Sequence, residues 1–281
     1  MPEDSKLPYV YILGMEHSGS TLLAFLLNAH PQMATIGEVD VAHDILPARW
    51  EQRRGRCSCG KRYFNCKFWQ AVLAGMAVSG SGLGKPGLFD YQPLDMETAQ
   101  KKLFDFSAAV LDVSDTAVFV DASKKSEYIQ PLRENPFIDL RVLNIYRDGR
   151  GVVNSWRKNN PNESVPNLIR KWLKQEKKRT EALKNFSRRN IFSFKYENLC
   201  LQPGKMLPKI FSFIGVQPDV DVTQGYKSEV EHHIVGNPMR LSTNEIILLD
   251  EKWRRELSED DLRAFKRLRG NIQNRKNGYW R

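Results

Sequence analysis

Short apolar runs and stretches of helical periodicity alternate along the chain. Runs rich in β-branched and aromatic residues predict buried strands at residues 9–13, 117–120, 140–146 and 191–194. Stretches with apolar residues at helical spacing predict helices at residues 18–29, 96–113, 167–186 and 244–270. This alternation predicts an α/β fold with a central, mainly parallel sheet that is covered by helices on both faces.

Residues 43–93 interrupt this alternation. They contain Cys57, Cys59 and Cys66 and a Gly/Ser-rich stretch at residues 75–87. Long irregular segments inside compact domains tend to be functional loops, so we interpret this segment as a substrate-side insertion. Its aromatic residues, which could line a pocket or pack a satellite core, are Trp50, Tyr63, Phe64 and Trp69.

Composition and charge narrow the class of protein. A chain of 281 residues with 41% hydrophobic residues can bury one substantial core, so we expect a single domain over residues 1–281. The chain has no apolar run of about 18 residues, and its N-terminus lacks the apolar stretch of a signal peptide, which predicts a cytoplasmic protein without a membrane span. The formal net charge of +10 indicates either a polyanionic ligand or a basic, solvated surface.

The clustered cysteines leave several interpretations open. Cys57, Cys59 and Cys66 could be zinc ligands that take a fourth ligand from a distant residue, a redox pair, or thiols without a shared role. The paired C-x2-C spacing that is typical of zinc sites is absent. A cytoplasmic setting argues against a structural disulfide.

The first strand leads into a turn and a helix that suit a phosphate-like anion. Gly14 and Gly19 have the spacing of a Walker A loop, and Ser20-Thr21 follows where a nucleotide kinase carries Lys-Ser or Lys-Thr. Backbone N–H groups at such a helix N-terminus bind phosphate. The lysine that serves a β- or γ-phosphate is missing, which argues against a kinase.

A second group of anion-binding residues follows the strand at residues 140–146. Arg147 comes directly after this strand, and Ser155 lies eight residues later, about two turns into the next helix. Ligands of doubly wound folds bind at the carboxyl ends of the strands, where a guanidinium and a hydroxyl can hold a phosphate. The alternative interpretation is a surface pair of Arg147 and Asp148 with an uninvolved serine.

Together these segments resemble the sulfotransferases that use 3′-phosphoadenosine-5′-phosphosulfate (PAPS). In that family a K/R-S-G-T/S-T loop binds the 5′-phosphosulfate, and an Arg and a Ser eight residues apart bind the 3′-phosphate. The matching residues here are His17-Ser-Gly-Ser-Thr21 and Arg147 with Ser155. Weaker matches in family order are Gly37-Glu38, Val120-Asp-Ala-Ser-Lys124, Lys195-Tyr-Glu-Asn-Leu199 and the cysteine-containing segment from Cys57 to Trp69.

The resemblance implies a P-loop-containing nucleoside-triphosphate-hydrolase-like fold. It also implies sulfonate transfer from PAPS to a hydroxyl or amine, which leaves adenosine 3′,5′-bisphosphate (PAP) and requires no metal. The expected acceptor is a small soluble molecule and not a nucleic acid or a membrane. The residues that the resemblance places on the donor are Glu16, His17, Ser18, Gly19, Ser20, Thr21, Arg147, Ser155, Tyr196 and Arg240.

The same resemblance implies the catalytic roles. Glu38 is the expected general base that deprotonates the acceptor as it attacks. His43 is the runner-up for a different reason, because it lies nearby in the same ungapped segment. His17 stands where the family usually carries Lys or Arg, so its assistance to the leaving group depends on its pKa. Lys124, at the end of a neighbouring strand, is the expected substitute cation.

Two other functions fit parts of the sequence. A small-molecule or nucleotide kinase would use ATP and place Asp121, near a strand end, on magnesium. Our interpretation of Asp121 is instead a hydrogen-bonding residue in the wall of the site. A nucleic-acid-binding module would use the C-terminal cations, but the sequence has no aromatic and basic RNA-reading motif.

Overall fold

The computed structural model describes residues 6–42, 56–82, 88, 96–226, 232–234 and 246–279. At its centre is a five-stranded sheet with the order β2-β3-β1-β4-β5, in which all neighbouring strands are parallel. The strands are β1 (Leu7–Leu13), β2 (Met33–Thr35), β3 (Val118–Lys124), β4 (Ile138–Tyr146) and β5 (Ile191–Lys195). The predicted fold class and four predicted strands are confirmed. β2 is not among the predicted strands because three residues are too few to show an alternation.

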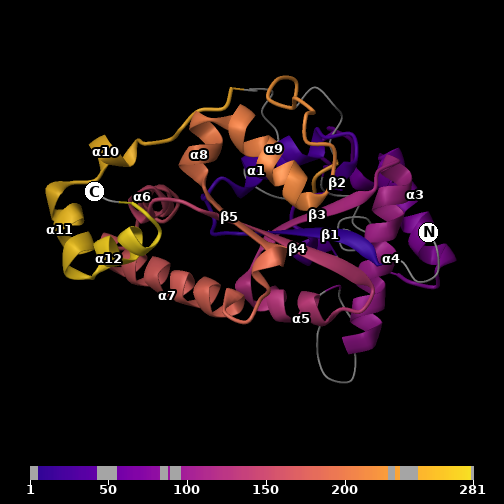
Figure 1. Ribbon diagram of the computed structural model, residues 1–281, viewed down its shortest axis with the longest axis horizontal. Coiled ribbons are helices and arrows are strands. Elements are labelled where there is room, and N and C mark those ends of the chain that lie inside the picture. The colour runs from indigo at the N-terminus through magenta and orange to yellow at the C-terminus, as the bar shows by residue number, and fades with distance from the viewer. Residues whose placement is uncertain are drawn as a thin grey trace.

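Helices cover both faces of the sheet (Figure 1). The helices on one face share an apolar cluster with Val10 and Ile12 of β1, and they are α1 (Ser20–Asn28), α8 (Tyr196–Leu201) and α9 (Pro203–Ile214). The helices on the other face form a cluster with Tyr9 and Tyr11, and they are α3 (Lys67–Val78), α4 (Met96–Ser114) and α5 (Ile129–Glu134). Alternate residues of β1 enter different cores, as expected for a central strand that is buried on both sides.

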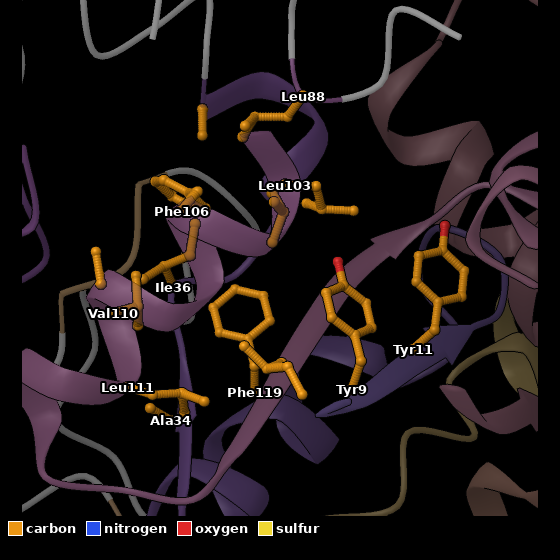
Figure 2. Packing of buried hydrophobic residues seen from close by; sticks show 14 of the residues in the cluster. Tyr9, Tyr11, Ala34, Ile36, Leu88, Leu103, Phe106, Val110, Leu111 and Phe119 are labelled. Carbon is orange, nitrogen blue, oxygen red and sulfur yellow. The ribbon is translucent and has the colours of Figure 1, made fainter. Parts of the chain in front are cut away.

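Figure 2 shows part of the core on the α4 side of the sheet. Tyr9 and Phe119 lie on neighbouring strands with their ring centroids 5.3 Å apart. Phe106 of α4 meets Phe119 edge-on at 6.4 Å. Tilted and edge-on contacts suit the charge distribution of aromatic rings, and each ring buries a large apolar area. This packing fixes β1 and β3, whose carboxyl ends lie beside the candidate site.

The described part of the cysteine-containing segment belongs to this same core. Tyr63 and Trp69 are fully buried in it, so these two aromatic residues pack the core and do not line a pocket. Residues 67–78 form α3, so the prediction of an irregular segment is wrong there. The helix is hard to predict because it contains Gly75, and glycine has a low helix propensity. The packing explains the glycine, since a Cβ there would come 3.3 Å from Ala109 of α4. The runner-up base His43 and Trp50 lie outside the described residues.

The predicted long helix at residues 244–270 is wrong. Residues 246–250 are not helical, and three short helices follow, namely α10 (Trp253–Glu256), α11 (Glu259–Arg267) and α12 (Gly270–Lys276). Ser258 and Asp261 form a capping box that begins α11, and Arg269 adopts a left-handed φ of 64° after this helix ends. The three helices lie at one end of the molecule beside α6 (Gly149–Asn159) and α7 (Val165–Leu183) (Figure 1).

Short 3-10 helices occupy Val39–Val41, Tyr63–Asn65, Ser126–Tyr128 and Arg188–Asn190. In the part of the chain that the structure describes, no helix combines the length and the apolar character needed to cross a lipid bilayer.

Candidate functional site

A cavity of about 440 Å³ opens at the carboxyl edge of the sheet. Parallel strands end together at this edge, so residues that are far apart in the sequence meet there. The lining residues are Glu16, His17, Gly19, Ser20, Thr21, Leu22, Glu38, Lys124, Arg147, Ser155, Tyr196, Ile246, Leu248 and Asp250. Among the described residues, every predicted site residue except Ser18 and Asp121 lines the cavity, and Arg240 and the runner-up base His43 lie outside the described ranges.

The N-terminus of α1 contributes backbone donors to the cavity that have no hydrogen-bond partner among the described residues. Gly19 precedes the helix with a left-handed φ of 91°, which glycine adopts without strain. Leu23 N–H donates to the Gly19 carbonyl at 3.0 Å. The preceding N–H groups, those of Ser20, Thr21 and Leu22, therefore have no partner within the helix. Donors of this kind, together with the positive end of the helix dipole, favour an anion.

Ser18 stabilises this turn by hydrogen bonds to the Met15 backbone. Its hydroxyl donates to the Met15 carbonyl at 2.6 Å and accepts from Met15 N–H at 3.1 Å. The Ser18 N–H also donates to the Met15 carbonyl, at 3.1 Å. Ser18 is 1% exposed, so its polar groups hold the shape of the turn and do not face the cavity.

The Arg147 side chain joins the two predicted anion-binding segments. Its Nη1 donates to the backbone carbonyl of His17 at 2.8 Å, and its Nη2 donates to the carbonyl of Asp250 at 2.5 Å. Nη2 also lies 3.2 Å from the Asp250 carboxylate, and the guanidinium lies over the Tyr196 ring at 4.7 Å from its centroid. Arg147 thus points to the turn after β1. The alternative surface pair is wrong, because Asp148 binds Arg150 instead, at 2.6 Å.

The start of α6 keeps Arg147 in place. Asp148 caps this helix by accepting from Arg150 N–H at 2.9 Å, and Asn274 of α12 donates to the same Asp148 oxygen at 2.9 Å. Gly151 leaves room for the arginine, since a Cβ there would come 2.9 Å from Arg147 Nε. The segment Arg147-Asp-Gly-Arg-Gly151 therefore encodes both the cap and the space that the guanidinium needs. Ser155 lies on the same helix, at the cavity.

Tyr196 lines the cavity directly beside the turn. A Cβ at Gly19 would come 2.3 Å from the Tyr196 ring, so the ring packs directly on the glycine. The Tyr196 hydroxyl donates to the Leu248 carbonyl and accepts from Asp250 N–H, both at 3.2 Å. Burial raises the pKa of the Tyr196 phenol well above its usual value, so Tyr196 acts as a neutral residue.

Glu38 and Lys124 form an ion pair at the cavity. Lys124 ends β3 at an irregularity in the pairing with β1, where Tyr11 pairs with Asp121 and Leu13 pairs with Lys124. The extra residue in β3 is a bulge, which redirects a side chain. Lys124 also has a left-handed φ of 69°, a strained conformation for a residue with a side chain. The bulge and this conformation bring the ammonium to Glu38, which follows β2.

His17 is a neutral donor in this environment. Burial lowers the pKa of His17, and although nearby Glu16 opposes this change, Arg147 and Lys124 add to it. Asn159 Nδ2 lies 3.0 Å from His17 Nε2. An amide N–H can only donate, so Nε2 accepts and the ring proton of neutral His17 is on Nδ1. His17 has a left-handed φ of 64°, the second strained residue at the site.

Asp121 does not line this cavity. It is fully buried and accepts hydrogen bonds from the Tyr9 hydroxyl at 2.8 Å and from Ser123 N–H at 2.8 Å. Burial raises the pKa of Asp121 to about 7, although these hydrogen bonds oppose the change. The interpretation of Asp121 as a residue of the site wall is therefore wrong. Its hydrogen bonds instead connect β3 to Tyr9 of β1 and stabilise the end of β3 at Ser123.

Asp250 is a site residue that sequence reasoning misses. Burial raises its pKa, but a hydrogen bond from Lys252 N–H and the Arg147 guanidinium outweigh this effect and leave the pKa below its usual range. No motif marks Asp250, because it comes from an irregular segment that packs on Tyr196 and Arg147 only in the folded chain. Among the described residues, both Lys and Arg side chains that line the cavity are paired with a carboxylate, Lys124 with Glu38 and Arg147 with Asp250.

A second cavity of about 260 Å³ adjoins the first. The two share Glu16, Glu38 and Lys124. The other residues of the second cavity are mostly polar or charged, and they include Lys125 and Lys178. Glu38 is therefore accessible from both cavities.

The fold and the site define an α/β transferase-like protein with a P-loop-like turn that is suited to a sulfonate or phosphate ester. Residues 8–220 match the sequence profile of the Sulfotransferase family, so the chain belongs to this family. The resemblance found in the sequence is confirmed, and the protein is a sulfotransferase enzyme.

A solved structure shares this fold, and others show a weaker similarity to the chain. The sulfotransferase domain of the Synechococcus PCC 7002 olefin synthase is 17% identical with a TM-score of 0.57, over 95% of this chain and 97% of that one. A sulfotransferase from Alicyclobacillus acidocaldarius is 13% identical with a TM-score of 0.43, over 95% of this chain and 96% of that one. A mouse sulfotransferase, SULT7A1, complexed with PAP, is 14% identical with a TM-score of 0.46, over 97% and 85% of the two chains. No curated protein matches the sequence.

Proposed function

We propose that this protein transfers a sulfonate group from PAPS to a hydroxyl or amine of a small soluble acceptor by in-line displacement. The observation that carries the proposal is the hydrogen bond from Arg147 to the His17 carbonyl at 2.8 Å. It joins the turn after β1 to the strand–helix junction after β4, and both line one cavity. A nucleotide with phosphates at two positions needs hydrogen-bond donors at two places in the same cavity, and these two segments supply them.

The donor-binding residues fit this role by their chemistry. The N–H groups of Ser20 and Thr21 suit the phosphosulfate, and Arg147 with the Ser155 hydroxyl suits the 3′-phosphate. When bound, PAPS supplies the sulfonate group and a bisphosphate leaving group. Lys124 and neutral His17 stabilise the negative charge that develops on the leaving oxygen, so the proposed chemistry needs no metal.

Glu38 is the proposed general base. Its carboxylate lies between the two cavities, and we place the acceptor in the smaller one. From there Glu38 takes the proton of the attacking hydroxyl or amine, while the pair with Lys124 fixes its orientation. The polar lining of the smaller cavity favours a hydrophilic acceptor.

Titration calorimetry tests the donor. We expect adenosine 3′,5′-bisphosphate to bind, and ATP, with or without magnesium, to bind much more weakly. Preference for ATP, or magnesium-dependent ATP hydrolysis, would favour the kinase alternative and contradict the proposal. That alternative is already disfavoured, because Asp121 is buried beneath the site with Tyr9 and Ser123 as partners.

The nucleic-acid alternative has its own readout. Binding to single-stranded RNA that weakens steeply with salt, without affinity for the bisphosphate, would support it. A turnover assay with labelled PAPS and a metabolite extract then identifies the acceptor. If the protein binds the bisphosphate but labels no hydroxyl or amine compound, the proposed acceptor class is wrong.

A further inference from the structure

The cysteines of the segment at residues 56–66 converge with a histidine that lies more than 160 positions later in the chain. Cys57, Cys59, Cys66 and His232 each offer one ligand atom, and these atoms all lie within 4.8 Å of one another. We propose that these four residues bind one structural zinc ion. The site is separate from the sulfonate-transfer site, and the inference does not depend on the proposed function.

The distances between the ligand atoms suit a tetrahedral zinc ion. Cys59 Sγ lies 3.7 Å from Cys66 Sγ, and His232 Nδ1 lies 3.4 Å from Cys57 Sγ and 3.3 Å from Cys66 Sγ. Zinc bonds of ~2.3 Å to sulfur and ~2.0 Å to nitrogen separate tetrahedral ligands by ~3.8 Å for two sulfurs and ~3.5 Å for sulfur and nitrogen. Three thiolates and one imidazole form a closed ligand set of the kind found in structural zinc sites.

Backbone hydrogen bonds hold the ligands in this arrangement. Cys57 begins a tight turn in which its N–H donates to the Lys61 carbonyl and its carbonyl accepts from Gly60 N–H, both at 2.9 Å. Cys66 lies at the N-terminus of α3, which is packed into the core. The Phe68 ring stacks on the His232 imidazole at 4.3 Å with an interplanar angle of 3°, and so fixes the ring plane that aims Nδ1 at the sulfurs.

The two other interpretations of the cysteines fit less well. None of the four cysteines is in a disulfide, and the Cys59 and Cys66 sulfurs are too far apart for an S–S bond of ~2.05 Å. Thiols without a shared role would not require a histidine from a distant segment to point at them. Zinc binding converts three thiols to thiolates and releases their protons to solvent, while neutral His232 donates its Nδ1 lone pair.

The zinc ion would connect the cysteine segment to residues 232–234, which in turn contact the segment between β2 and Glu38. His233 N–H donates to the Ser58 hydroxyl at 2.8 Å, and Ile234 N–H donates to the Ile36 carbonyl at 3.0 Å. Ile36 lies two residues before Glu38. The metal therefore stabilises the segment that leads from β2 to the proposed base.

Metal analysis of the purified protein tests the site. We expect close to one zinc ion per chain after expression in zinc-supplemented medium and gel filtration. Cys59→Ser and His232→Gln should lose bound zinc; we choose them because both positions are half-buried, so the replacements disturb the core least. Cys200→Ser is the matched control, since Cys200 is a buried free cysteine of α8 outside the cluster, and it should keep its zinc.

Cobalt substitution provides a readout that does not depend on a variant folding. Cobalt added to the reduced, metal-free protein should give the strong visible bands and thiolate charge-transfer absorption of a tetrahedral sulfur-rich site. Zinc should displace it and raise the melting temperature. A weak, octahedral cobalt spectrum, a zinc content near zero, or equal zinc in Cys59→Ser and wild type would overturn the proposal.

Discussion

At the scale of single residues, one side chain of the site, that of Arg147, makes several contacts. Arg147 is 7% exposed and contacts the His17 carbonyl, the Asp250 carboxylate and the Tyr196 ring at once. A buried guanidinium with fixed partners loses little further freedom when it binds an anion, which favours affinity. In the proposed complex, the 3′-phosphate competes with Asp250 for the Arg147 guanidinium.

Replacing Arg147 should weaken binding of adenosine 3′,5′-bisphosphate. Arg147→Ala removes a charged hydrogen-bond donor, which typically costs about 1.5–3 kcal/mol, or roughly 10- to 150-fold in Kd. Calorimetry measures the loss. Arg263→Ala is the control, because Arg263 is exposed on α11 and pairs with Asp260 there, and it should bind like wild type. Equal affinities of the two variants would show that Arg147 does not contact the ligand.

Glu38→Gln should separate binding from turnover. The amide cannot accept a proton from the acceptor, so sulfonate transfer should fall by about 100-fold or more, the range typical of general bases. The bisphosphate should still bind, since Glu38 does not belong to the proposed donor contacts. Single-turnover transfer and calorimetry on the same preparation measure the two quantities. Unchanged turnover would mean that another group is the base.

Asp250→Asn should strengthen bisphosphate binding several-fold. The variant removes a negative charge 3.2 Å from Arg147 Nη2, while the Asp250 carbonyl and the His17 carbonyl still hold the guanidinium. Glu251→Gln is the neighbouring control, because Glu251 pairs with Arg254 instead. Weaker binding by Asp250→Asn would indicate that the carboxylate positions Arg147 more than it competes with the ligand.

At the scale of elements, the strand–turn–helix unit at residues 7–28 forms the turn that we propose binds the phosphosulfate. β1 is buried on both faces, the turn is braced by Ser18 and Met15, and α1 begins at a glycine in a left-handed conformation. These features are local, so the sequence predicts them well. The break between α10 and α11 is also encoded locally, by the capping box at Ser258. The residues around it nevertheless keep a helical spacing, so the prediction of one helix at residues 244–270 overlooked the break.

Gly19→Ala should damage this unit. A Cβ there would come 2.3 Å from the Tyr196 ring and would be strained at a φ of 91°, so the turn must shift and bisphosphate binding should be lost. Gly204→Ala is the matched control in α9, because a Cβ at Gly204 meets nothing within 4 Å. We expect it to leave binding unchanged and to stabilise the protein by up to ~1 kcal/mol. Calorimetry and melting temperatures measure both effects.

At the scale of the whole molecule, the buried Asp121 links stability to pH. Its pKa is about 7 in the folded chain, against 3.8 for an unperturbed carboxyl. Between about pH 4 and pH 7 the folded protein retains a proton that the unfolded chain releases, so this group makes stability fall as pH rises through that window. The slope for one proton is at most about 1.4 kcal/mol per pH unit.

Asp121→Asn should remove this contribution. The free energy of unfolding of wild type, minus that of the variant, should be larger at pH 5 than at pH 8, because only wild type loses a bound proton between these values. Denaturant titrations at the two pH values measure the difference. An unchanged or opposite difference would mean that Asp121 is ionised in the folded protein throughout this range.

The sequence alone determined the alternation of strands and helices, the turn between Gly14 and Gly19, and the positions of Arg147 and Ser155 after β4. Each of these depends on neighbouring residues and on the rule that parallel strands end at one edge. Only the tertiary structure decided that Lys124 pairs with Glu38, that Asp250 lies on Arg147, and that His232 joins the cysteines. These contacts join segments that are far apart in the chain. Tertiary packing and the bulge in β3 decide which residues meet, and no local sequence pattern encodes the packing or the bulge.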